Sequence, residues 1–399
     1  MTVPGPALTL SLPLSLQLSL TLSLYLSLSL SPILRNARGG ASATVIPMRT
    51  IPECFHPLIR TWFADEVGPP TAIQSLAWPR IATGDHVLVT APTGSGKTLA
   101  AFLWALDQLL TGAWESGGTR VLYITPVKAL GTDISRNLRA PLDRLSAIGR
   151  DQGWTVPAIG IRSGDTPQAD RRRMLKHPPE ILITTPESLN LLLTSPNGRR
   201  MLGALETVIL DEIHAVVDSK RGIHLITAVE RLAAVTGEFQ RIGLSATINP
   251  LDRVARWMGG RELVAPGTHR ERPVIVLESP DTKPMDVAVG SSLHDGAAVP
   301  RDREAFWECL ATDLRRDIAH HHSTLVFANS RRMVERVARL VNEGAGDHLA
   351  WSHHGALSRE IRHLVEQRLK AGALRAIVAT NSLELGIDVG AVDQVVLVQ

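Results

Sequence analysis

The segment VLVTAPTGSGKTLAAFL, residues 87–103, constrains the fold more than any other part of the chain. An apolar run leads into the loop APTGSGKT, residues 91–98, and a helix-like pattern follows directly. Gly94 and Gly96 let backbone N–H groups turn toward an anion, and a helix that begins here adds the positive end of its dipole. This order of strand, loop and helix is that of a P-loop, although Ala91 stands where the general pattern has a glycine. The segment therefore predicts a nucleotide phosphate site in an α/β fold.

Short apolar runs alternate with longer helix-like segments from about residue 50 onward. Most of these runs are apolar at every position, as strands buried on both faces of a parallel sheet must be. The expected strands are residues 86–90, 121–125, 181–185, 207–211, 241–247, 323–329, 375–380 and 394–398. Repeated βαβ units of this kind predict a doubly wound α/β fold.

A change in composition from Val264 to Asp302, where five prolines occur with little periodicity, predicts a connection between two α/β domains. We expect a first domain at 48–265, a linker at 266–302 and a second domain at 303–399. The second domain has about three expected strands, and the last of them would be an unprotected edge. The second domain is therefore expected to be incomplete at its C-terminal end.

The first 47 residues contain a ladder in which leucine fills every even position from 8 to 30. A single strand over this ladder would be roughly 76 Å long, and a helix would spread the leucines around all its sides. No basic residue precedes the ladder, and the small-residue ASA at 41–43 lies too far beyond it for an export signal. We expect residues 1–47 to be a non-structural leader or a misassigned start before Met48, with membrane insertion and export as the alternatives left open.

Charge and cysteine content constrain function weakly. The 42 basic and 39 acidic side chains leave a formal charge of +3, so no strong global field indicates nucleic acid or membrane. Two distant cysteines, Cys54 and Cys309, exclude a disulfide framework and favour a reducing compartment, which predicts the cytoplasm. The histidines at 320–322 and 353–354 lack a cysteine or acid at zinc-like spacing, so no zinc site is predicted.

The segment TVILDEIH, residues 207–214, supplies the acids that a nucleotide site needs. Asp211 at the end of a buried strand can hold Mg²⁺, and Glu212 can orient and deprotonate an attacking water. In the loop, Lys97 can reach the β- and γ-phosphates and Thr98 can ligate Mg²⁺. An acidic pair that caps a helix is the alternative for these two carboxylates, and a helix histidine is the alternative for His214.

With these motifs in order, the chain resembles the DExH-box superfamily 2 helicases, and more closely the large helicase-related (Lhr) family of DNA translocases. The resemblance covers about residues 50–399. The motifs that carry it are PPTAIQSLAWPRI, APTGSGKTLAAFL, TPVKALGTD, RSGDT, TTPESL, DEIH, LSAT, VFANSRRMVERV, WSHHGALSREIR and ATNSLELGIDVGAVDQVV.

The resemblance implies two tandem RecA-like P-loop domains that use ATP and Mg²⁺ to act on single-stranded nucleic acid. In it, Lys97, Asp211 and Glu212 are catalytic, Thr98 and Asp211 hold Mg²⁺, and Gln74 reads the adenine edge. The implied nucleotide-binding residues are Gln74, Thr93, Gly94, Ser95, Gly96, Lys97, Thr98, Gly386 and Asp388. The residues implied to couple hydrolysis to domain movement are His214, Ser245 and Thr247. Those implied to line a single-strand channel are Lys128, Gly164, Thr185, Asn329, Arg331, His354, Thr380 and Ser382.

Lys128 and Arg331 can pair with phosphates, and hydroxyls can hold a backbone without reading its sequence, so binding should depend on salt and tolerate many sequences. The family's arginine-bearing motif after the last strand is absent here, so this chain is expected to be an N-terminal part of a longer helicase and to hydrolyse ATP slowly. The resemblance implies 3′-to-5′ movement on DNA in repair and no stable membrane association. An RNA helicase and a non-hydrolysing nucleic-acid clamp remain the alternatives.

Overall fold

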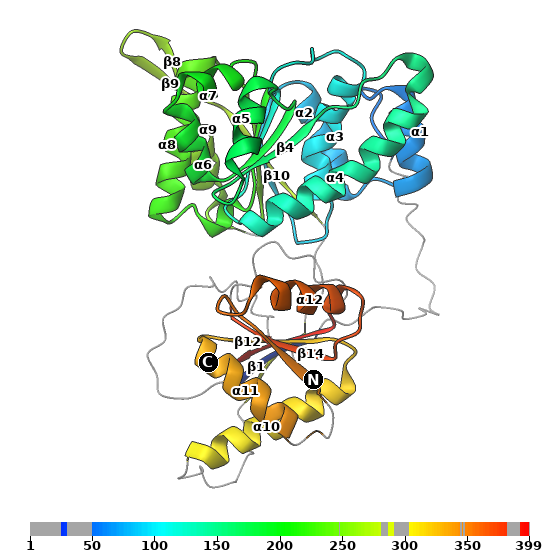
Figure 1. Cartoon of the computed structure of the whole chain (residues 1–399), viewed down its shortest axis with the longest axis vertical. Helices are drawn as coiled ribbons and strands as arrows, with labels where there is room; N and C mark the ends of the chain where they lie inside the picture. Colours follow the sequence, from blue (N-terminus) through cyan, green and yellow to red (C-terminus); the bar gives the residue numbers. More distant parts are fainter. Residues whose placement is uncertain are drawn as a thin grey trace, which may run out of the picture. The chain divides into compact units, whose positions relative to one another are not determined.

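The computed structural model describes residues 25–29, 50–246, 248–280, 286–290, 303–343, 345, 348–380 and 392–398. These residues form two compact units (Figure 1). The first is built from residues 50–280, and the second from residues 25–29 and the described residues of 286–398. Within the described residues, no helix has both the length and the apolar character needed to cross a membrane.

The first unit is built on a seven-stranded sheet in the order β10-β2-β7-β6-β3-β5-β4, and every pairing in it is parallel. Because the strands are parallel, their carboxyl ends meet at one edge of the sheet. The strands are β2 (His86–Thr90), β3 (Val121–Ile124), β4 (Ile159–Arg162), β5 (Ile181–Thr184), β6 (Thr207–Leu210), β7 (Gln240–Ser245) and β10 (Val274–Glu278). A separate hairpin pairs β8 (Arg261–Ala265) with β9 (Thr268–Glu271).

Helices cover both faces of this sheet (Figure 1). On one face lie α1 (Pro57–Trp62), η1 (Phe63–Val67), α2 (Ala72–Ala82), α3 (Lys97–Leu110) and α4 (Lys128–Ile148). On the other lie α6 (Pro186–Leu193), α7 (Pro196–Met201), η3 (Ile213–Ala215), α8 (Lys220–Thr236) and α9 (Leu251–Gly259). The remaining helices are η2 (Arg150–Gln152) and α5 (Gln168–Lys176).

Successive strand residues enter opposite cores, as the pleat requires. Val87 and Val89 pack with the α1–α4 layer, whereas Leu88 packs with the α6–α9 layer. Two such cores explain why these strands are apolar at every position.

The second unit contains a six-stranded sheet in the order β11-β1-β15-β12-β14-β13. Its strands are β1 (Tyr25–Ser29), β11 (Asp286–Gly290), β12 (Thr324–Ala328), β13 (Ala350–His353), β14 (Ala376–Ala379) and β15 (Gln394–Val398). Strands β12 to β15 pair in parallel, whereas β1 runs antiparallel to β11 and β15. Its helices are α10 (Arg303–His320), α11 (Arg331–Glu343) and α12 (Arg359–Lys370), and a single core joins α10 and α11 to the sheet.

The predicted α/β fold with parallel sheets is confirmed, and each of the eight expected strands is present within two residues of its predicted bounds. The first-unit boundary expected near residue 265 is too early. The apolar run Val274–Glu278 lies in the predicted linker but pairs with β2, so it completes the first sheet. Prolines on both sides of this strand made its sequence resemble a linker rather than a strand.

Two expectations for the second unit also need correction. Strand β15 is not an edge, because it lies between β12 and β1. The leader is not wholly non-structural either, since Tyr25–Ser29 pairs with β15. The ladder alternates with period two, which is the period of a strand, and β15 offers it unpaired backbone groups.

Candidate functional site

The P-loop, the DEIH acids and Ser245 converge at the carboxyl edge of the first sheet. The P-loop follows β2, Asp211 and Glu212 follow β6, and Ser245 ends β7. These three strands are neighbours in the sheet. The backbone joins the segments directly, since the amide of Ala91 donates to the carbonyl of Ser245 at 3.2 Å.

The P-loop backbone has the form of an anion cradle. Gly94 and Gly96 lie in the left-handed region, with φ of +78° and +85°. Gly96 begins α3 and provides no side-chain cap, whereas hydroxyls cap α2, α6, α7 and α8. Gly96 therefore provides no side-chain oxygen that would compete with a phosphate for the N-terminus of α3.

Lys97 lies against the loop that carries it. Its Nζ donates to the carbonyls of Ala91 and Pro92, the latter at 2.9 Å. A phosphate would compete well for this ammonium, because hydrogen bonds between two charged groups are stronger than those to a neutral carbonyl. Thr98, the next residue of α3, is half-buried, and Thr93 is exposed in the loop.

Gln74 ties α2 to the P-loop. Its Oε1 accepts from the amide of Thr71 at 2.9 Å, and its Nε2 donates to the carbonyl of Gly96 at 3.3 Å. The hydroxyl of Thr71 donates to the carbonyl of Ser95 at 2.9 Å. A Cβ on Gly96 would lie 2.5 Å from Nε2 of Gln74, so glycine is needed there for space as well as for φ. Gln74 thus supports the loop, and its reading of adenine stays a prediction.

Asp211 is buried and held at both oxygens. The hydroxyl of Tyr123 donates to its Oδ2, and the amide of Glu212 donates to its Oδ1 at 2.9 Å. Burial and the neighbouring Glu212 carboxylate raise the pKa of Asp211 to about 6. Tyr123 comes from the adjacent strand β3, and its ring stacks on Phe102 of α3 at 5.2 Å between centroids.

Glu212 has a left-handed backbone, with φ of +50°, which is uncommon for a residue with a side chain. Burial raises the pKa of its carboxyl, and the charge of Lys97 opposes that effect. A buried carboxylate with a raised pKa is a better proton acceptor than an exposed one.

His214 links Glu212 to β7. The amide of Ala246 donates to its Nδ1 at 3.2 Å, and an amide can only donate. Nδ1 therefore carries the lone pair and Nε2 carries the hydrogen, and Nε2 lies 3.3 Å from Oε2 of Glu212. Burial lowers the pKa of His214, which favours this neutral form. Oγ of Ser245 also lies 3.4 Å from Nδ1.

The predicted nucleic-acid residues of the first unit lie at the other half of the same edge. Lys128, Gly164 and Thr185 follow β3, β4 and β5, which are neighbours in the sheet. The carbonyl of Gly164 accepts from Arg171 at 2.7 Å. Thr185 is buried and caps α6 by accepting from the amide of Ser188 at 3.4 Å.

In the second unit, four predicted residues follow strands β12 to β14. Asn329 and Arg331 are exposed at the start of α11. His354 is only 5% exposed, and its Nε2 lies 2.6 Å from Oε1 of Glu335. The amide of Thr380 donates to the carbonyl of His353 at 3.2 Å. The remaining predicted residues, Thr247, Ser382, Gly386 and Asp388, lie outside the described residues.

Two residues at this edge were missed from the sequence. Tyr123 carries a polar tip in an otherwise apolar strand, and that feature could have indicated a partner on β6. Arg162 ends β4, and its Nη1 is buried without a hydrogen-bond partner among the described residues. Burial and the nearby Arg171 lower the pKa of Arg162, so this guanidinium lies where an anion would be stabilised.

Two family models match the chain. The model of the DEAD/DEAH box helicase matches residues 71–254, and that of the helicase conserved C-terminal domain matches residues 305–399.

Proteins of similar sequence are named as Lhr helicases. The chain is 43% identical to an Lhr helicase/probable uracil glycosylase of Mycolicibacterium smegmatis, over 86% of this chain and 24% of that protein. It is 40% identical to the ATP-dependent helicase Lhr-Core protein 2 of Thermococcus barophilus, over 85% of this chain and 40% of that one. The chain thus spans well under half the length of these relatives.

A solved structure agrees with these relatives. The Mycobacterium smegmatis helicase Lhr bound to ssDNA and AMP-PNP superposes with a TM-score of 0.70 at 43% identity. The match covers 85% of this chain and 43% of that one.

Proposed function

The chain belongs to the large helicase-related (Lhr) family of DEAD/DEAH box helicases, and on that premise we propose that it binds and hydrolyses ATP to move along single-stranded DNA. The observation that carries the proposal is the convergence of the P-loop, Asp211 and Ser245 at three neighbouring strand ends. A similar structure holds ssDNA and an ATP analogue, which supports both ligands.

The P-loop would bind the triphosphate. The uncapped N-terminus of α3 supplies N–H donors, and Lys97 exchanges the carbonyls of Ala91 and Pro92 for phosphate oxygens. The donor set of Thr98 hydroxyl and Asp211 carboxylate fits Mg²⁺, which takes oxygen ligands. A bound Mg²⁺ would neutralise charge on the phosphates.

Glu212 would be the general base. Nε2 of His214 lies 3.3 Å from Oε2 of Glu212, and Oε1 would accept a proton from water. The pKa of Glu212 is raised by burial, so the proton transfer is easier than it would be to an exposed glutamate.

The position of His214 supports the proposal that His214 and Ser245 couple ATP hydrolysis to domain movement. His214 contacts the base on one side and the end of β7 on the other. A movement of the segment that carries Glu212 would therefore be transmitted through the imidazole of His214 to the end of β7, and the reverse. Thr247 follows in the same motif and keeps its predicted role as a proposal.

Nucleic acid would lie along the β3, β5 and β4 half of the edge, where Lys128, Gly164 and Thr185 begin the segments that follow those strands. The sheet thereby separates the two ligands: β2, β7 and β6 carry the nucleotide motifs. Reading of adenine by Gln74, strand contacts by Asn329, Arg331, His354, Thr380 and Ser382, and nucleotide contacts by Gly386 and Asp388 belong to this proposal. So does a cytoplasmic location, which the two distant cysteines favour.

The test measures binding and turnover separately. A fluorescent ATP analogue and fluorescein-labelled oligo-dT report binding, and phosphate release with and without oligo-dT reports turnover. Glu212→Gln is expected to keep nucleotide binding and to lower stimulated turnover by about 10² or more, because the base is lost. Lys97→Ala is expected to lose nucleotide binding and to keep oligo-dT binding.

Glu206→Gln, an exposed pair partner of Arg120 at the other edge of the sheet, serves as the matched control. Equal turnover by Glu212→Gln and the control would contradict the assignment of the base. An oligo-U probe of the same length is the RNA arm, and stronger stimulation by oligo-U than by oligo-dT would replace DNA with RNA.

A further inference from the structure

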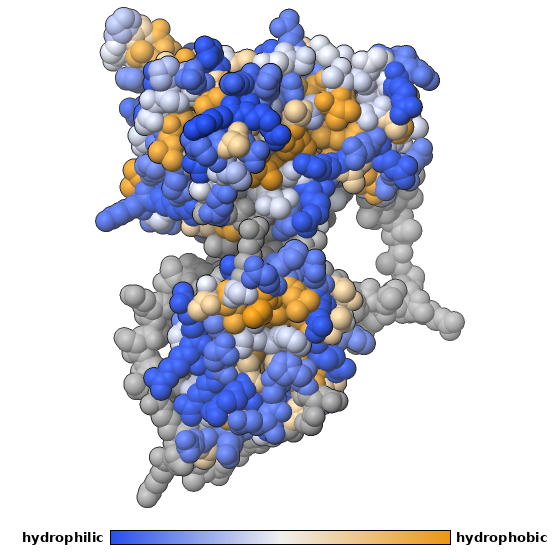
Figure 2. Space-filling view, in the orientation of Figure 1, coloured by the Kyte–Doolittle hydropathy of each residue, from blue (hydrophilic) through white to orange (hydrophobic). Residues whose placement is uncertain are grey.

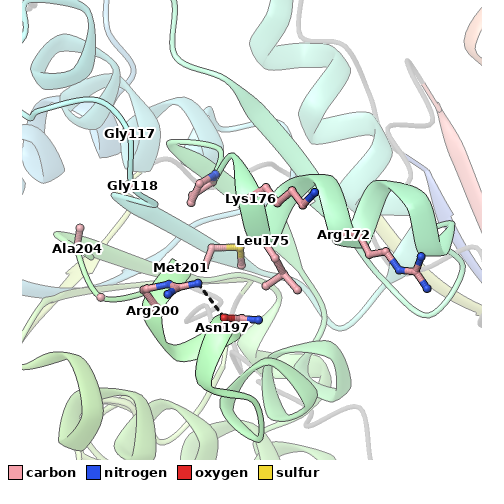
Figure 3. A pocket seen from close by; sticks show the side chains of 11 residues that line it. Gly117, Gly118, Arg172, Leu175, Lys176, Asn197, Arg200, Met201 and Ala204 are labelled. Atoms are coloured by element: carbon pink, nitrogen blue, oxygen red, sulfur yellow. Dashed lines mark hydrogen bonds between the residues drawn. The ribbon is translucent and has the colours of Figure 1, made fainter.

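An open pocket of about 930 Å³ lies at the amino edge of the first sheet, opposite to the nucleotide motifs. Its walls come from the residues that precede three neighbouring strands, with Gly117 and Gly118 before β3, Pro178 before β5 and Ala204 before β6. Helices α5 and α7 complete it (Figure 3).

Three cationic side chains line this pocket: Arg172 and Lys176 from α5, and Arg200 from α7. Among the described residues that line the pocket, none is acidic. Arg172 and Lys176 form no ion pair with any residue that the structure describes, and Arg200 donates to the amide oxygen of Asn197 at 2.8 Å. Figure 2 shows a strongly hydrophilic surface over α5.

Two acids close in sequence to the pocket residues have partners other than the pocket cations. Both oxygens of Glu180 accept from backbone amides, Oε1 from Gly117 at 3.1 Å and Oε2 from Ala158 at 2.8 Å. Asp170 pairs with Arg173 at 3.5 Å. Neither of these two acids therefore forms an ion pair with Arg172, Lys176 or Arg200.

The floor of the pocket is apolar. Leu175 and Met201 line it (Figure 3), and because Met201 is only 2% exposed, the half-buried Leu175 provides the accessible apolar surface. Three glycines, Gly117, Gly118 and Gly203, leave the walls without side chains. A Cβ on Gly117 would meet no atom within 4 Å, so the wall is open at that point.

This combination discriminates between anionic partners. Single-stranded nucleic acid is held by cations together with aromatic side chains on which bases stack, and no aromatic residue lines the described pocket. A phosphate group alone would leave the apolar surface of Leu175 uncovered. A peptide that carries carboxylates and an aliphatic side chain uses both features.

We propose that this pocket is a docking site for an acidic, leucine-containing peptide segment of a partner protein. The carboxylates pair with Arg172, Lys176 and Arg200, and the aliphatic side chain covers Leu175. Since the pocket lies at the amino edge and the ATP and nucleic-acid motifs at the carboxyl edge, a docked partner leaves both substrate sites accessible. The inference is independent of ATP hydrolysis.

The test measures fluorescence anisotropy of labelled peptides with the 399-residue chain. The probe is a fluorescein-labelled octapeptide of sequence EDLEDLED, and the matched peptide replaces both leucines with serine. We expect saturable binding of the leucine peptide, at least about fivefold weaker binding of the serine peptide, and a steep loss of affinity with added salt. Oligo-dT of eight nucleotides tests the nucleic-acid alternative.

Arg172→Glu and Arg200→Glu are each expected to weaken the leucine peptide about tenfold, because a cation becomes a repelling acid. Arg253→Glu, which reverses an exposed arginine on α9 outside the pocket, is expected to change affinity less than twofold. Thermal unfolding of each variant confirms that the fold is retained.

Three results would overturn the proposal. No saturable binding at about 1 mM peptide excludes a docking site of useful affinity. Equal affinities for the two peptides show that the floor has no role. Weakening of oligo-dT, rather than of peptide, by Arg172→Glu and Arg200→Glu assigns the pocket to nucleic acid instead.

Discussion

At the scale of single residues, the contact between Tyr123 and Asp211 has the clearest chemical consequence. Tyr123 donates to one oxygen of the carboxylate that would hold Mg²⁺, and its ring is fixed on Phe102 of the helix that follows the P-loop. Tyr123 therefore positions the metal ligand relative to the phosphate loop. Such partners of ligating carboxylates commonly affect metal affinity as strongly as some ligands do.

The substitution Tyr123→Phe removes the hydroxyl and keeps the ring. We expect Mg²⁺-dependent binding of the ATP analogue to need about tenfold more Mg²⁺, because Asp211 loses the donor that orients it. Nucleotide binding without Mg²⁺ should change little, since the P-loop is untouched. Titration of Mg²⁺ at fixed nucleotide measures the effect, and an unchanged Mg²⁺ midpoint would show that Tyr123 does not position Asp211.

The raised pKa of Asp211 predicts a cost in stability at neutral pH. A carboxyl whose pKa is about 6 when folded and 3.8 in its ordinary state is protonated more readily in the folded chain. The cost is therefore fully present above about pH 6 and disappears as the pH falls toward 4, which is opposite to the effect of a salt-bridged carboxylate.

Asp211→Asn should thus stabilise the nucleotide-free chain, by an amount on the order of 3 kcal/mol at neutral pH and by almost nothing near pH 4. Urea unfolding of both chains between these pH values measures the difference. Asp151→Asn, at an exposed acid of the same unit, is the control. A stabilisation that did not vary with pH would contradict the assigned cause.

Residue patterns predicted which side chains reach the site but not how they are held. The P-loop pattern predicted that Lys97 begins the helix after a strand, and the DEIH pattern predicted that Asp211 and Glu212 follow a buried strand, as the structure has them. The hydrogen bonds of Tyr123 to Asp211 and of Gln74 to Gly96 join residues 88 and 22 positions apart. Such pairings depend on strand order, which no local pattern encodes.

At the scale of elements, a buried ionic cluster attaches β10 to the first sheet. Arg272, just before β10, forms two hydrogen bonds of 2.7 Å with Glu238 and one of 3.1 Å with Glu230. Arg241 of β7 is fully buried and pairs with the same Glu230 at 2.6 Å. The cluster joins β7, α8 and the approach to β10.

Arg272→Met is expected to lower the free energy of unfolding by about 2 kcal/mol, because it removes a buried guanidinium from Glu230 and Glu238, whose carboxylates stay partly exposed. Arg261→Met breaks a nearby pair with Glu271 in which both side chains are more than half exposed, and should cost less than about 1 kcal/mol. Urea unfolding of the two variants gives the comparison. Equal losses would show that the cluster contributes no more than a surface pair.

Strand prediction succeeded where both faces are buried and failed where they are not. The central strands β2, β3, β5, β6 and β7 are apolar throughout, so their sequences were sufficient. Edge strands β4 and β13 have mixed exposure and sequences of IGIR and AWSH, which carry no such signal. Strand β10 is apolar but follows Pro273, and the proline-rich context was read as a linker.

At the scale of the whole molecule, the first unit has its own sheet and two cores, and it contains the P-loop and DEIH motifs. It should therefore fold without the second unit, provided that β10 is included. Residues of β10 contribute to both cores, since Ile275 and Leu277 pack with one and Val274 and Val276 with the other.

Two shortened chains test where this unit ends. Residues 48–284 contain β10 and the Arg272 cluster, whereas residues 48–265 stop at the boundary expected from composition alone. We expect the longer chain to unfold cooperatively in urea and to bind the ATP analogue. The shorter chain should be less stable by at least about 3 kcal/mol, since it loses the cluster and exposes the edge of β2.

Arg272→Met in the longer chain separates the two contributions, because it removes the ionic contacts and keeps the strand. If the ionic cluster contributes most of the stability difference, this variant should be about as stable as residues 48–265. If the pairing of β10 and its core burial contribute most, the variant should be clearly more stable than residues 48–265. Equal urea midpoints for residues 48–265 and 48–284 would show that β10 is dispensable, and the domain boundary would then return to the position that the sequence composition indicates.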